Sequence, residues 1–356
     1  MTKRIVVKVG TKVLTDSSGV LNEKSLANIA EQISKLKSSG HDVVLVSSGA
    51  MGAGKSLLKT NKPLKAIAEK QLFAAIGQAH LIHRYSVHFK RLNLYCAQIL
   101  ATKEDFRDKA HYTNMKTCFE SLLHDKVIPI VNENDAISLN ELIFTDNDEL
   151  AGYVASMLNA DILIILTSVN GLLDTAKSPT KTIATITPKT TEKYINYITN
   201  DKSEAGRGGM STKFAVGKKL AKQGIEVIIA NGYTENIIID IITGKKIGTK
   251  FIAGKKIPNA RRRLAHAENQ VRGKVIVIKP GAVSAITDET KANSLLFVGI
   301  HALQGDFKKG DVIEILNSKD QVIGYGIAQY NSNEATKLIG QKNIKPLIHY
   351  DKMFIC

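Results

Sequence analysis

Apolar segments of two different periods alternate through the first 230 residues of this chain, and this alternation constrains the fold more than any other feature. Short continuous apolar runs, typical of buried strands, cover residues 4–9, 42–47, 94–99, 127–131, 162–167 and 225–230. Segments with helical spacing cover residues 22–38, 64–90, 112–124, 149–159 and 211–223. Strands that alternate with helices form βαβ units. The predicted fold class is therefore α/β, a mostly parallel sheet sandwiched by helices.

The pattern changes after residue 257. Pro258 and the run Arg261–Arg263 lead into short apolar segments that are separated by glycine-rich turns. These segments are Val275–Ile278, Leu295–Gly299, Val312–Leu316 and Val322–Ala328. Short strands with turn residues between them predict a small β-rich domain. We expect a first domain over residues 1–257, a basic linker over 258–272 and a second domain over 273–347.

Positive charge is concentrated at this expected linker. The formal net charge is +16, and eleven Lys and Arg residues stand between positions 245 and 279 against a single acid, Glu268. Such a run can attract nucleic acid or acidic partners. A solvated linker is the simpler interpretation, and the sequence alone leaves both open.

Composition excludes several other classes of protein. Apolar residues make up 44% of the 356 positions and charged residues 23%, as in soluble globular proteins. The three cysteines form neither a disulfide framework nor a zinc pattern, and the histidines of segment 64–90 lack regular ligand spacing, so no metal-ligating residues are predicted. The run Ile5–Val7 is too short for a signal peptide, and no stretch is long enough to span a membrane. A cytoplasmic location is expected.

Polar and glycine-rich segments follow the expected strands. They are Gly10-Thr11, Ser47–Ala50, Asn132–Asp135 and Thr167-Ser168. Ligands of parallel sheets bind beyond the carboxyl ends of the strands. We therefore expect these segments to line one site.

Two lysines can bring positive charge to that site. Lys8 lies in the first apolar strand, where an ammonium group is costly unless it has a function. Lys213 follows the Gly208-Gly209 turn at the expected start of a helix, where backbone N–H groups attract phosphate. The loop at 132–148 between them is rich in carboxylates and amides. The combination predicts a phosphotransferase with an anionic, amine-bearing acceptor.

A glycine-rich segment offers an alternative kinase assignment. Gly49–Ser56 formally satisfies the Walker A pattern of P-loop enzymes, with Lys55 as its lysine. Such enzymes also need a strand that ends in a magnesium-binding Asp. The best candidate is Ile237–Asp240, which no helical pattern separates from the preceding strand. The match to a P-loop kinase is therefore poor.

The ordered set of motifs points to a known family instead. The motifs are Val7–Thr11, Val46–Ala50, Asn132–Ala136, Asp146–Asp148 and Gly208–Lys213. Together they resemble the glutamate 5-kinases of the amino acid kinase family. The first two motifs are shared widely among amino acid kinases, whereas the Asn132–Ala136 and Gly208–Lys213 motifs are highly specific.

The C-terminal segments extend this resemblance to nearly the whole chain. They look like the PUA domain that many of these kinases carry, and the segments concerned are Gly273–Val283, Ser294–Leu296, Gly305–Phe307, Tyr330–Ser332 and Asp351–Met353. The resemblance implies an amino acid kinase fold followed by a small β-rich PUA-like domain.

The resemblance also implies a reaction and a set of roles. The reaction is ATP-dependent phosphorylation of the side-chain carboxylate of L-glutamate, the first step of proline biosynthesis, with probable feedback inhibition by proline. The implied catalytic residues are Lys8, Lys213 and Asp148. The implied glutamate-binding residues are Ser48, Gly49, Ala50, Asp135 and Asn147. The implied nucleotide-binding residues are Lys8, Gly10, Thr167, Ser168, Arg207, Gly208, Gly209, Met210, Ser211, Thr212 and Lys213.

Cofactor and partners follow from the same resemblance. Magnesium would accompany ATP and be bound mainly by the phosphates, in keeping with its preference for water and phosphate oxygens. A homo-oligomer and a contact with glutamyl-5-phosphate reductase are further expectations.

The chain departs from the family pattern at several positions. The family usually has Asp where this chain has Ser168, Tyr where it has Leu173, and Thr where it has Arg207. All three lie on the expected nucleotide side, so they bear on nucleotide affinity and base preference more than on the acceptor. In the PUA-like segment, Lys279–Ala282 stands where an acidic sequence is usual.

Two other functions stay open at this stage. One is an amino acid kinase with a different carboxylate, carbamate or nucleotide acceptor. The other is an RNA-binding or RNA-modification protein, which the PUA resemblance and the basic run would support. Aromatic residues make up only 6% of the chain and Trp is absent, so platforms for base stacking are scarce.

Overall fold

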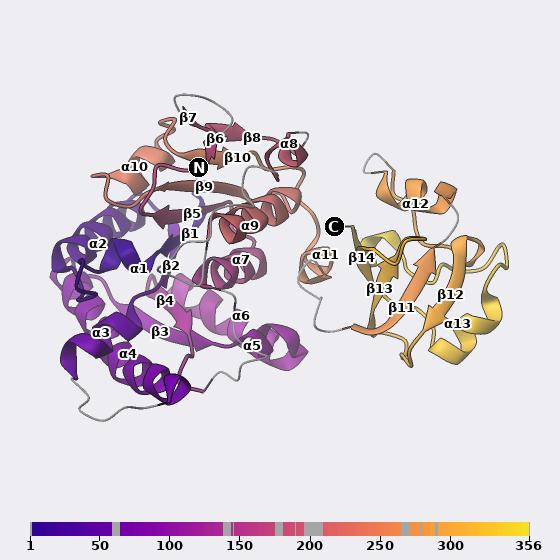
Figure 1. Cartoon of the computed structure of the whole chain (residues 1–356), viewed down its shortest axis with the longest axis horizontal. Coiled ribbons are helices and arrows are strands. Elements are labelled where there is room, and N and C mark those ends of the chain that lie inside the picture. Colours follow the sequence, from indigo (N-terminus) through magenta and orange to yellow (C-terminus); the bar gives the residue numbers. More distant parts are fainter. Residues whose placement is uncertain are drawn as a thin grey trace. The chain divides into compact units, whose positions relative to one another are not determined.

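The chain divides into two compact units, Met1–Lys256 and Ile257–Cys356 (Figure 1). The computed structural model describes all residues except 1, 59–64, 138–143, 145, 175–180, 189, 196–208, 265–270, 278–279, 289–290 and 356. Within the described part, no helix is long and apolar enough to cross a membrane.

An eight-stranded sheet forms the centre of the first unit, in the order β3-β4-β2-β1-β5-β9-β10-β8. The strands are β1 (Arg4–Val9), β2 (Asp42–Ser47), β3 (Cys96–Ala101), β4 (Ile128–Glu133), β5 (Ile162–Thr167), β8 (Thr185–Ile186), β9 (Glu226–Asn231) and β10 (Thr249–Phe251). The pairs from β3 to β9 are parallel, and β10 is antiparallel to β9. The predicted α/β class with a mostly parallel sheet is confirmed.

Helices cover both faces of this sheet (Figure 1). One face carries α1 (Thr11–Leu14), α2 (Glu23–Ser38), α3 (Ala50–Leu57), α4 (Ala66–Arg91) and α10 (Ile237–Ile242). The other carries α5 (Lys103–Arg107), α6 (Lys109–His124), α7 (Asn147–Met157) and α9 (Met210–Lys222). Smaller elements are β6 (Leu173–Asp174), β7 (Lys181–Thr182) and α8 (Thr191–Ile195).

The central strands are apolar on both sides because both faces are covered. In β1, Val6 packs into the core under α7 and α9, whereas Ile5, Val7 and Val9 pack into the core under α2 and α4. All four side chains are fully buried. Continuous apolar runs rather than alternating ones are what a doubly covered parallel sheet requires.

The predicted helices and strands lie within a few residues of the observed ones. Asn22 caps α2, and its side chain accepts a hydrogen bond from the Ser25 N–H at 3.2 Å. Two helices begin earlier than predicted because an aspartate caps each of them: Asp108 precedes α6 and Asp146 precedes α7. The segment Ile237–Asp240, considered above as a strand, instead begins helix α10, because its isoleucines pack against α2 and the sheet.

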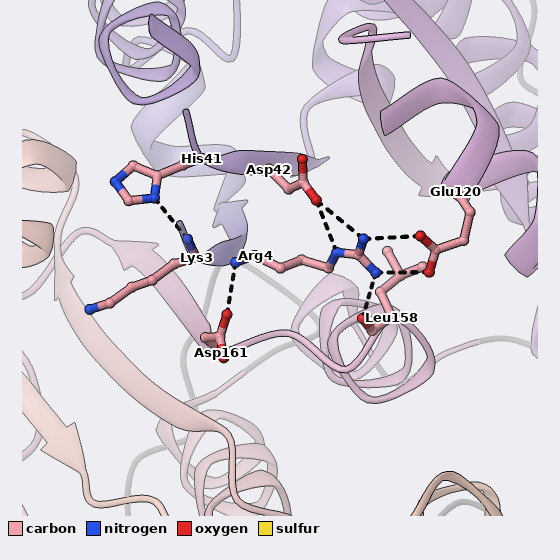
Figure 2. Close-up of polar contacts among 7 residues, drawn as sticks. All are labelled: Lys3, Arg4, His41, Asp42, Glu120, Leu158 and Asp161. Atoms are coloured by element: carbon pink, nitrogen blue, oxygen red, sulfur yellow. Dashed lines mark hydrogen bonds and ion pairs between the residues drawn. The ribbon is translucent and has the colours of Figure 1, made fainter. Parts of the chain in front are cut away.

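Polar contacts join the amino ends of the central strands (Figure 2). The Arg4 guanidinium donates to both carboxylate oxygens of Glu120 on α6, at 2.8 and 2.9 Å, and to the carbonyl of Leu158 at 3.0 Å. The same guanidinium lies 3.2 Å from Asp42 of β2, and the Arg4 N–H donates to Asp161 at 2.9 Å. These contacts fix the edge of the sheet opposite to the carboxyl ends of the strands.

The second unit is built on a five-stranded sheet in the order β12-β11-β13-β14-β15. The strands are β11 (Val271–Val277), β12 (Ile300–Gln304), β13 (Val312–Leu316), β14 (Val322–Ile327) and β15 (Met353–Ile355). Helices α11 (Asn259–Leu264), α12 (Pro280–Thr287) and α13 (Ser332–Leu338) accompany it. The predicted apolar segment Leu295–Gly299 contributes one isolated bridge and a short 3-10 helix rather than a strand.

Part of the expected basic linker is folded into this unit. Within 258–272, α11 and the first residues of β11 are regular structure. Arg261 donates to the Met353 carbonyl at 2.7 Å, and Arg262, only 3% exposed, donates to the Ile257 carbonyl at 3.0 Å. Leu264 is buried in a small apolar cluster with Phe354. The described part of this segment therefore includes regular structure and buried side chains of the second unit.

Candidate active site

Two lysine ammonium groups meet on one buried carboxylate at the carboxyl ends of the strands. Lys8 Nζ lies 2.6 Å from Asp148 Oδ1, and Lys213 Nζ lies 2.8 Å from Asp148 Oδ2. Asp148 is 0% exposed, and the two lysines are 5% and 7% exposed. Three elements that are distant in sequence, β1, α7 and α9, therefore supply one cationic cluster with a net charge of +1.

The charge state of Asp148 follows from this arrangement. Burial by itself would raise the pKa of the Asp148 carboxyl, but the charges and hydrogen bonds of Lys8 and Lys213 outweigh it and hold this pKa below its ordinary value. An ionised Asp148 keeps both ammonium groups in fixed positions. Ammonium groups fixed in this way can act on a third group, such as a phosphoryl oxygen.

Asp146 stands beside this cluster and has the opposite tendency. One of its carboxylate oxygens caps α7 by accepting hydrogen bonds from the Asp148 and Glu149 N–H groups, at 2.9 and 3.0 Å. Burial, together with the negative charge of Asp148, raises the pKa of Asp146 to about 6. Its second oxygen, Oδ2, is buried and has no hydrogen-bond partner among the described residues. A hard oxygen ligand is thus available next to the lysines.

The local sequence explains why Lys8 points into this site. β1 ends at Val9, and the Gly10 N–H donates to the Leu166 carbonyl of β5 at 3.0 Å. A Cβ atom at Gly10 would lie 3.2 Å from that carbonyl oxygen and 3.7 Å from Lys8 Nζ. Glycine therefore keeps the space beside the lysine ammonium open.

Lys213 occupies the first turn of α9. Gly209 is the N-cap residue, and Met210, Ser211 and Thr212 open the helix before it. Because the first N–H groups of a helix have no partner within the helix, this turn offers donors to an anion next to the Lys213 ammonium. Arg207 and Gly208, also expected at the nucleotide, lie outside the described residues.

Asn147 contacts residues of two segments that were expected to line the site. Its side-chain nitrogen donates to Ser48 Oγ and to Asn132 Oδ1, each at 2.9 Å. Its side-chain oxygen is buried without a hydrogen-bond partner among the described residues. Gly49, with a φ of 100°, turns the chain from β2 into α3, which begins at Ala50. Asn147 therefore links the Ser48–Ala50 turn to the end of β4.

Asp135 lies at the same edge but has a cationic neighbour. Its carboxylate is 2.7 Å from the Nζ atom of Lys70, a residue of α4. No lysine of α4 was among the residues predicted from the sequence.

The predicted nucleotide residues of β5 lie at the end of the neighbouring strand. Thr167 is the last residue of β5, and its carbonyl accepts a hydrogen bond from the Gly232 N–H at 2.8 Å. Ser168 follows directly. Leu173, one of the departures from the family pattern, is in β6 and is 44% exposed. β1 lies between β2 and β5, so the segments predicted to bind the acceptor and the nucleotide follow the two strands on either side of Lys8.

The Walker-like segment has a different structural role. Ala50–Leu57 is helix α3, and a Cβ atom at Gly54 or Gly77 would overlap backbone of the neighbouring helix, at Phe73 and Ala50 respectively. Lys55 is solvent exposed, with its Nζ 3.5 Å from Glu69. Gly54 of this segment and Gly77 of α4 therefore permit close packing of α3 on α4.

Comparison with known proteins assigns the fold and the site to a family. A sequence model described as the amino acid kinase family matches residues 3–231. The chain belongs to the amino acid kinase family. A model described as the PUA domain matches residues 274–350, so the second unit is a PUA domain.

Within the family, the chain belongs with the glutamate 5-kinases. It is 46% identical over 353 residues to a glutamate 5-kinase from Chlorobaculum tepidum, with 99% of this chain and 97% of the relative covered. It is 38% identical over 355 residues to one from Bacteroides thetaiotaomicron, with 99% and 98% covered. The family assignment made from the motifs is confirmed.

Solved structures of two other kinases share the fold. A carbamate kinase from Giardia lamblia, bound to AMP-PNP, has a TM-score of 0.53 and 19% identity, covering 71% of this chain and 99% of that one. A UMP kinase from Bacillus anthracis has a TM-score of 0.50 and 13% identity, covering 71% and 97%. These likenesses concern the fold alone.

The sequence analysis expected Asn132 to line the site without giving it a role, and it gave no role to Asp146 or Lys70. Asn132 and Asp146 stand inside the motifs that were recognised. Asp146 also directly precedes an apolar helical segment, and this position is typical of a helix cap, so the sequence carried a signal for it. Lys70 had no such signal, because one lysine among several on a helix gives no indication of what it contacts.

Proposed function

We propose that this chain transfers the γ-phosphoryl group of ATP to the side-chain carboxylate of L-glutamate and so forms L-glutamyl 5-phosphate. The observation that carries the proposal is the pair of lysine ammonium groups held on buried Asp148. The close relation to glutamate 5-kinases supports the choice of acceptor.

The acceptor needs no general base. A glutamate side chain has an ordinary pKa of about 4.3 and is ionised at neutral pH. The barrier lies in bringing this anion against the polyanionic γ-phosphate, so positioning and fixed positive charge have to lower it. A buried cationic cluster at the carboxyl end of β1 suits that requirement.

Lys8 and Lys213 would act on the transferring phosphoryl group from two sides. Both ammonium groups are oriented before substrate arrives, because each is held within 2.8 Å of a carboxylate oxygen that is itself fixed at the start of α7. Preorganised donors of this kind stabilise the charge that develops in the transition state without reorganising. Asp148 is the positioning residue for both.

The acceptor carboxylate would lie at the Ser48–Ala50 turn. The first backbone N–H groups of α3 would serve as donors there, because they have no partner within the helix, and the Asn147 side chain already contacts Ser48. Asp135, three residues after Asn132, provides a carboxylate for the α-ammonium group of the substrate. The nucleotide would extend along the Gly209–Lys213 turn and the ends of β1 and β5.

Magnesium bound with ATP would neutralise part of the phosphate charge. Within the described residues no group of three or more His, Cys, Asp and Glu side chains is arranged to hold a metal ion. The free Oδ2 atom of Asp146 is the one buried carboxylate oxygen beside the lysines that has no partner in the described part of the chain. A single such ligand fits an ion that is held mainly by phosphate oxygens.

The proposed reaction is the first step of proline biosynthesis, and proline would inhibit it at a site that overlaps the glutamate site. A homo-oligomer and a contact with glutamyl-5-phosphate reductase belong to the same proposal.

The test is an assay of ADP release with and without L-glutamate, with hydroxylamine present to trap the acyl phosphate as a hydroxamate. L-aspartate, carbamate and UMP serve as alternative acceptors. We expect ADP and hydroxamate in equal amounts with L-glutamate alone. ADP release that depends on one of the other acceptors, with no glutamyl hydroxamate, would assign a different kinase reaction to this site.

A further inference from the structure

Lys70 forms an ion pair with Asp135 but has no role in the function proposed above. The two groups are 2.7 Å apart, and their side chains are 19% and 17% exposed. They are thus largely enclosed but within reach of a ligand that enters the acceptor side. Asp135 is three residues beyond Asn132, so the pair is at most about 10 Å along the chain from the residue that contacts Asn147.

Helix α4 holds Lys70 firmly against this loop. The side chain of Gln71 donates to the Ala136 carbonyl at 3.0 Å, and the side chain of Gln78, two turns later, donates to the Glu133 carbonyl at 3.2 Å. One face of α4 therefore follows the chain from the end of β4 through Asp135.

Helix α4 also packs against the Ser48–Ala50 turn, the other segment proposed to bind the acceptor. A Cβ atom at Gly77 would overlap the carbonyl oxygen of Ala50, at the start of α3. Since Ala50 ends the Ser48–Ala50 turn, α4 contacts both segments that would bind the acceptor. Lys70 is accordingly in a fixed position relative to the site proposed for the γ-carboxylate.

A lysine paired with an aspartate is complementary to the head group of an α-amino acid. The head group has an ammonium and a carboxylate on adjacent atoms. Asp135 can accept from the α-ammonium group while Lys70 donates to the α-carboxylate, so that four alternating charges lie together. A single carboxylate at this position would bind an amine but would repel the α-carboxylate beside it.

We propose that Lys70 is a specificity-determining residue that binds the α-carboxylate of the substrate, so that the Lys70–Asp135 pair selects intact α-amino acids over simple amines and simple dicarboxylates. The proposal rests on the proposed function, since it names the group that distinguishes L-glutamate from other γ-carboxylates.

The existing ion pair does not oppose this role. Both side chains keep some solvent exposure, 19% and 17%, so separating the two groups slightly to admit a zwitterion leaves neither of them as an unpaired buried charge. In return, each group gains a charge-assisted hydrogen bond to the ligand. Without a ligand, Lys70 neutralises Asp135, which keeps an unpaired carboxylate away from the incoming γ-phosphate.

The experiment uses the full chain and three ligands that share the γ-carboxylate. L-glutamate has both head-group charges, 4-aminobutyrate lacks the α-carboxylate, and glutarate lacks the α-ammonium. For wild type and for Lys70→Met, the KM and kcat of L-glutamate are measured, with the inhibition constants of the other two. Lys70→Arg and Lys55→Met, the latter on an exposed ion-paired lysine of α3, are the conservative variant and the control.

We expect Lys70→Met to raise the KM of L-glutamate and the inhibition constant of glutarate by about tenfold or more, the effect of losing one charged hydrogen bond. The inhibition constant of 4-aminobutyrate should stay the same or fall, and kcat should change much less than KM. Lys70→Arg should recover part of the loss, and Lys55→Met should match wild type.

Two results would overturn the inference. One is an equal weakening of L-glutamate and 4-aminobutyrate, which would mean that Lys70 only supports Asp135. The other is an unchanged KM for L-glutamate. Failure of the proposed function would look different, because wild type itself would then form no glutamyl hydroxamate.

Discussion

Asp148 has no exposed surface, and it is tolerated there as an anion because Lys8 and Lys213 both contact it. Removing one partner of a buried ion cluster leaves an uncompensated charge, which is strongly destabilising. The activity of variants at this cluster must therefore be measured on protein that is shown to be folded. Methionine is a suitable replacement for each lysine, because it keeps much of the side-chain length and removes the charge.

Lys8→Met and Lys213→Met should each lower kcat by about a hundredfold or more, the scale of losing one preorganised transition-state donor. The KM of L-glutamate should change much less, because neither lysine is assigned to the acceptor. Steady-state kinetics on protein with an unchanged circular dichroism spectrum is the measurement. A variant that kept more than half of the wild-type kcat would exclude that lysine from the mechanism.

Asp146 gives a prediction on pH and stability. Its pKa of about 6 lies above the ordinary value of 3.8, so the folded state holds this proton more strongly than the unfolded state does. That contribution is present at low pH and is lost as pH rises through about 6. Asp146→Asn keeps the helix cap but removes the charge, so the variant should gain stability relative to wild type at pH 8 more than at pH 5.

Urea unfolding of both proteins at these two pH values measures this difference. The pKa of Asp148 lies below its ordinary value of 3.8, so Asp148 stays ionised at both pH values and adds no pH dependence of its own to the comparison. A difference in stability that did not depend on pH would show that Asp146 has an ordinary pKa.

At the scale of elements, the site depends on how closely α3 approaches α4. Gly54 and Gly77 have no side chains that would hold the helices apart, and a Cβ atom at either position would overlap backbone of the other helix. This contact places the start of α3, and with it the Ser48–Ala50 turn, against the helix that carries Lys70. Packing and substrate binding are therefore coupled through α4.

Gly77→Ala should destabilise the first unit by about 1–3 kcal/mol, as overpacking does, and should raise the KM of L-glutamate. Thermal unfolding and kinetics measure the two effects. Gly281→Ala, at a helical glycine where no atom lies within 4 Å of the added Cβ, is the matched control and should cause no loss. Equal behaviour of the two variants would contradict the close packing.

Lys55 tests the alternative kinase assignment. It is exposed and paired with Glu69 on a helix, whereas a P-loop lysine contacts the phosphates. Lys55→Ala should therefore retain wild-type kcat and ATP KM. A loss as large as that of Lys8→Met would return the P-loop mechanism to consideration.

For the whole molecule, each unit has an apolar core of its own. Residues of the lysine cluster and all assigned acceptor residues belong to Met1–Lys256. The last residue of this unit, Lys256, pairs with Asp161 at 2.7 Å. The PUA domain contributes no assigned group, and RNA binding by it stays a prediction.

A chain that ends at Lys256 should fold and form glutamyl hydroxamate, with a kcat within about threefold of the full chain, because contacts between domains of one chain are usually modest. Proline inhibition or assembly should change instead. The measurement compares kcat and proline inhibition of the two chains. Folded but inactive truncated protein would show that the second unit completes the site.

The sequence by itself determined the elements and their order. Buried strands of a doubly covered sheet must be continuously apolar, so β1, β2 and β5 were predicted at their observed bounds. The helices were recognised because their apolar residues recur every three to four positions. The motifs identified the family and marked Lys8 and Lys213 as site residues. Each lysine stands in a recognisable local pattern, Lys8 in an apolar strand and Lys213 after a Gly-Gly turn at the start of a helix.

Only the tertiary structure decided which side chains meet. Asp148 between two lysines, Asn147 between Ser48 and Asn132, and Lys70 on Asp135 join residues that are 15 to more than 100 positions apart. Such pairs depend on strand order and helix packing, which leave no periodic signal. Gly54 of α3 is the converse case. It stands in a phosphate-binding pattern in sequence, yet it permits close helix packing, because a local pattern cannot reveal which backbone lies opposite.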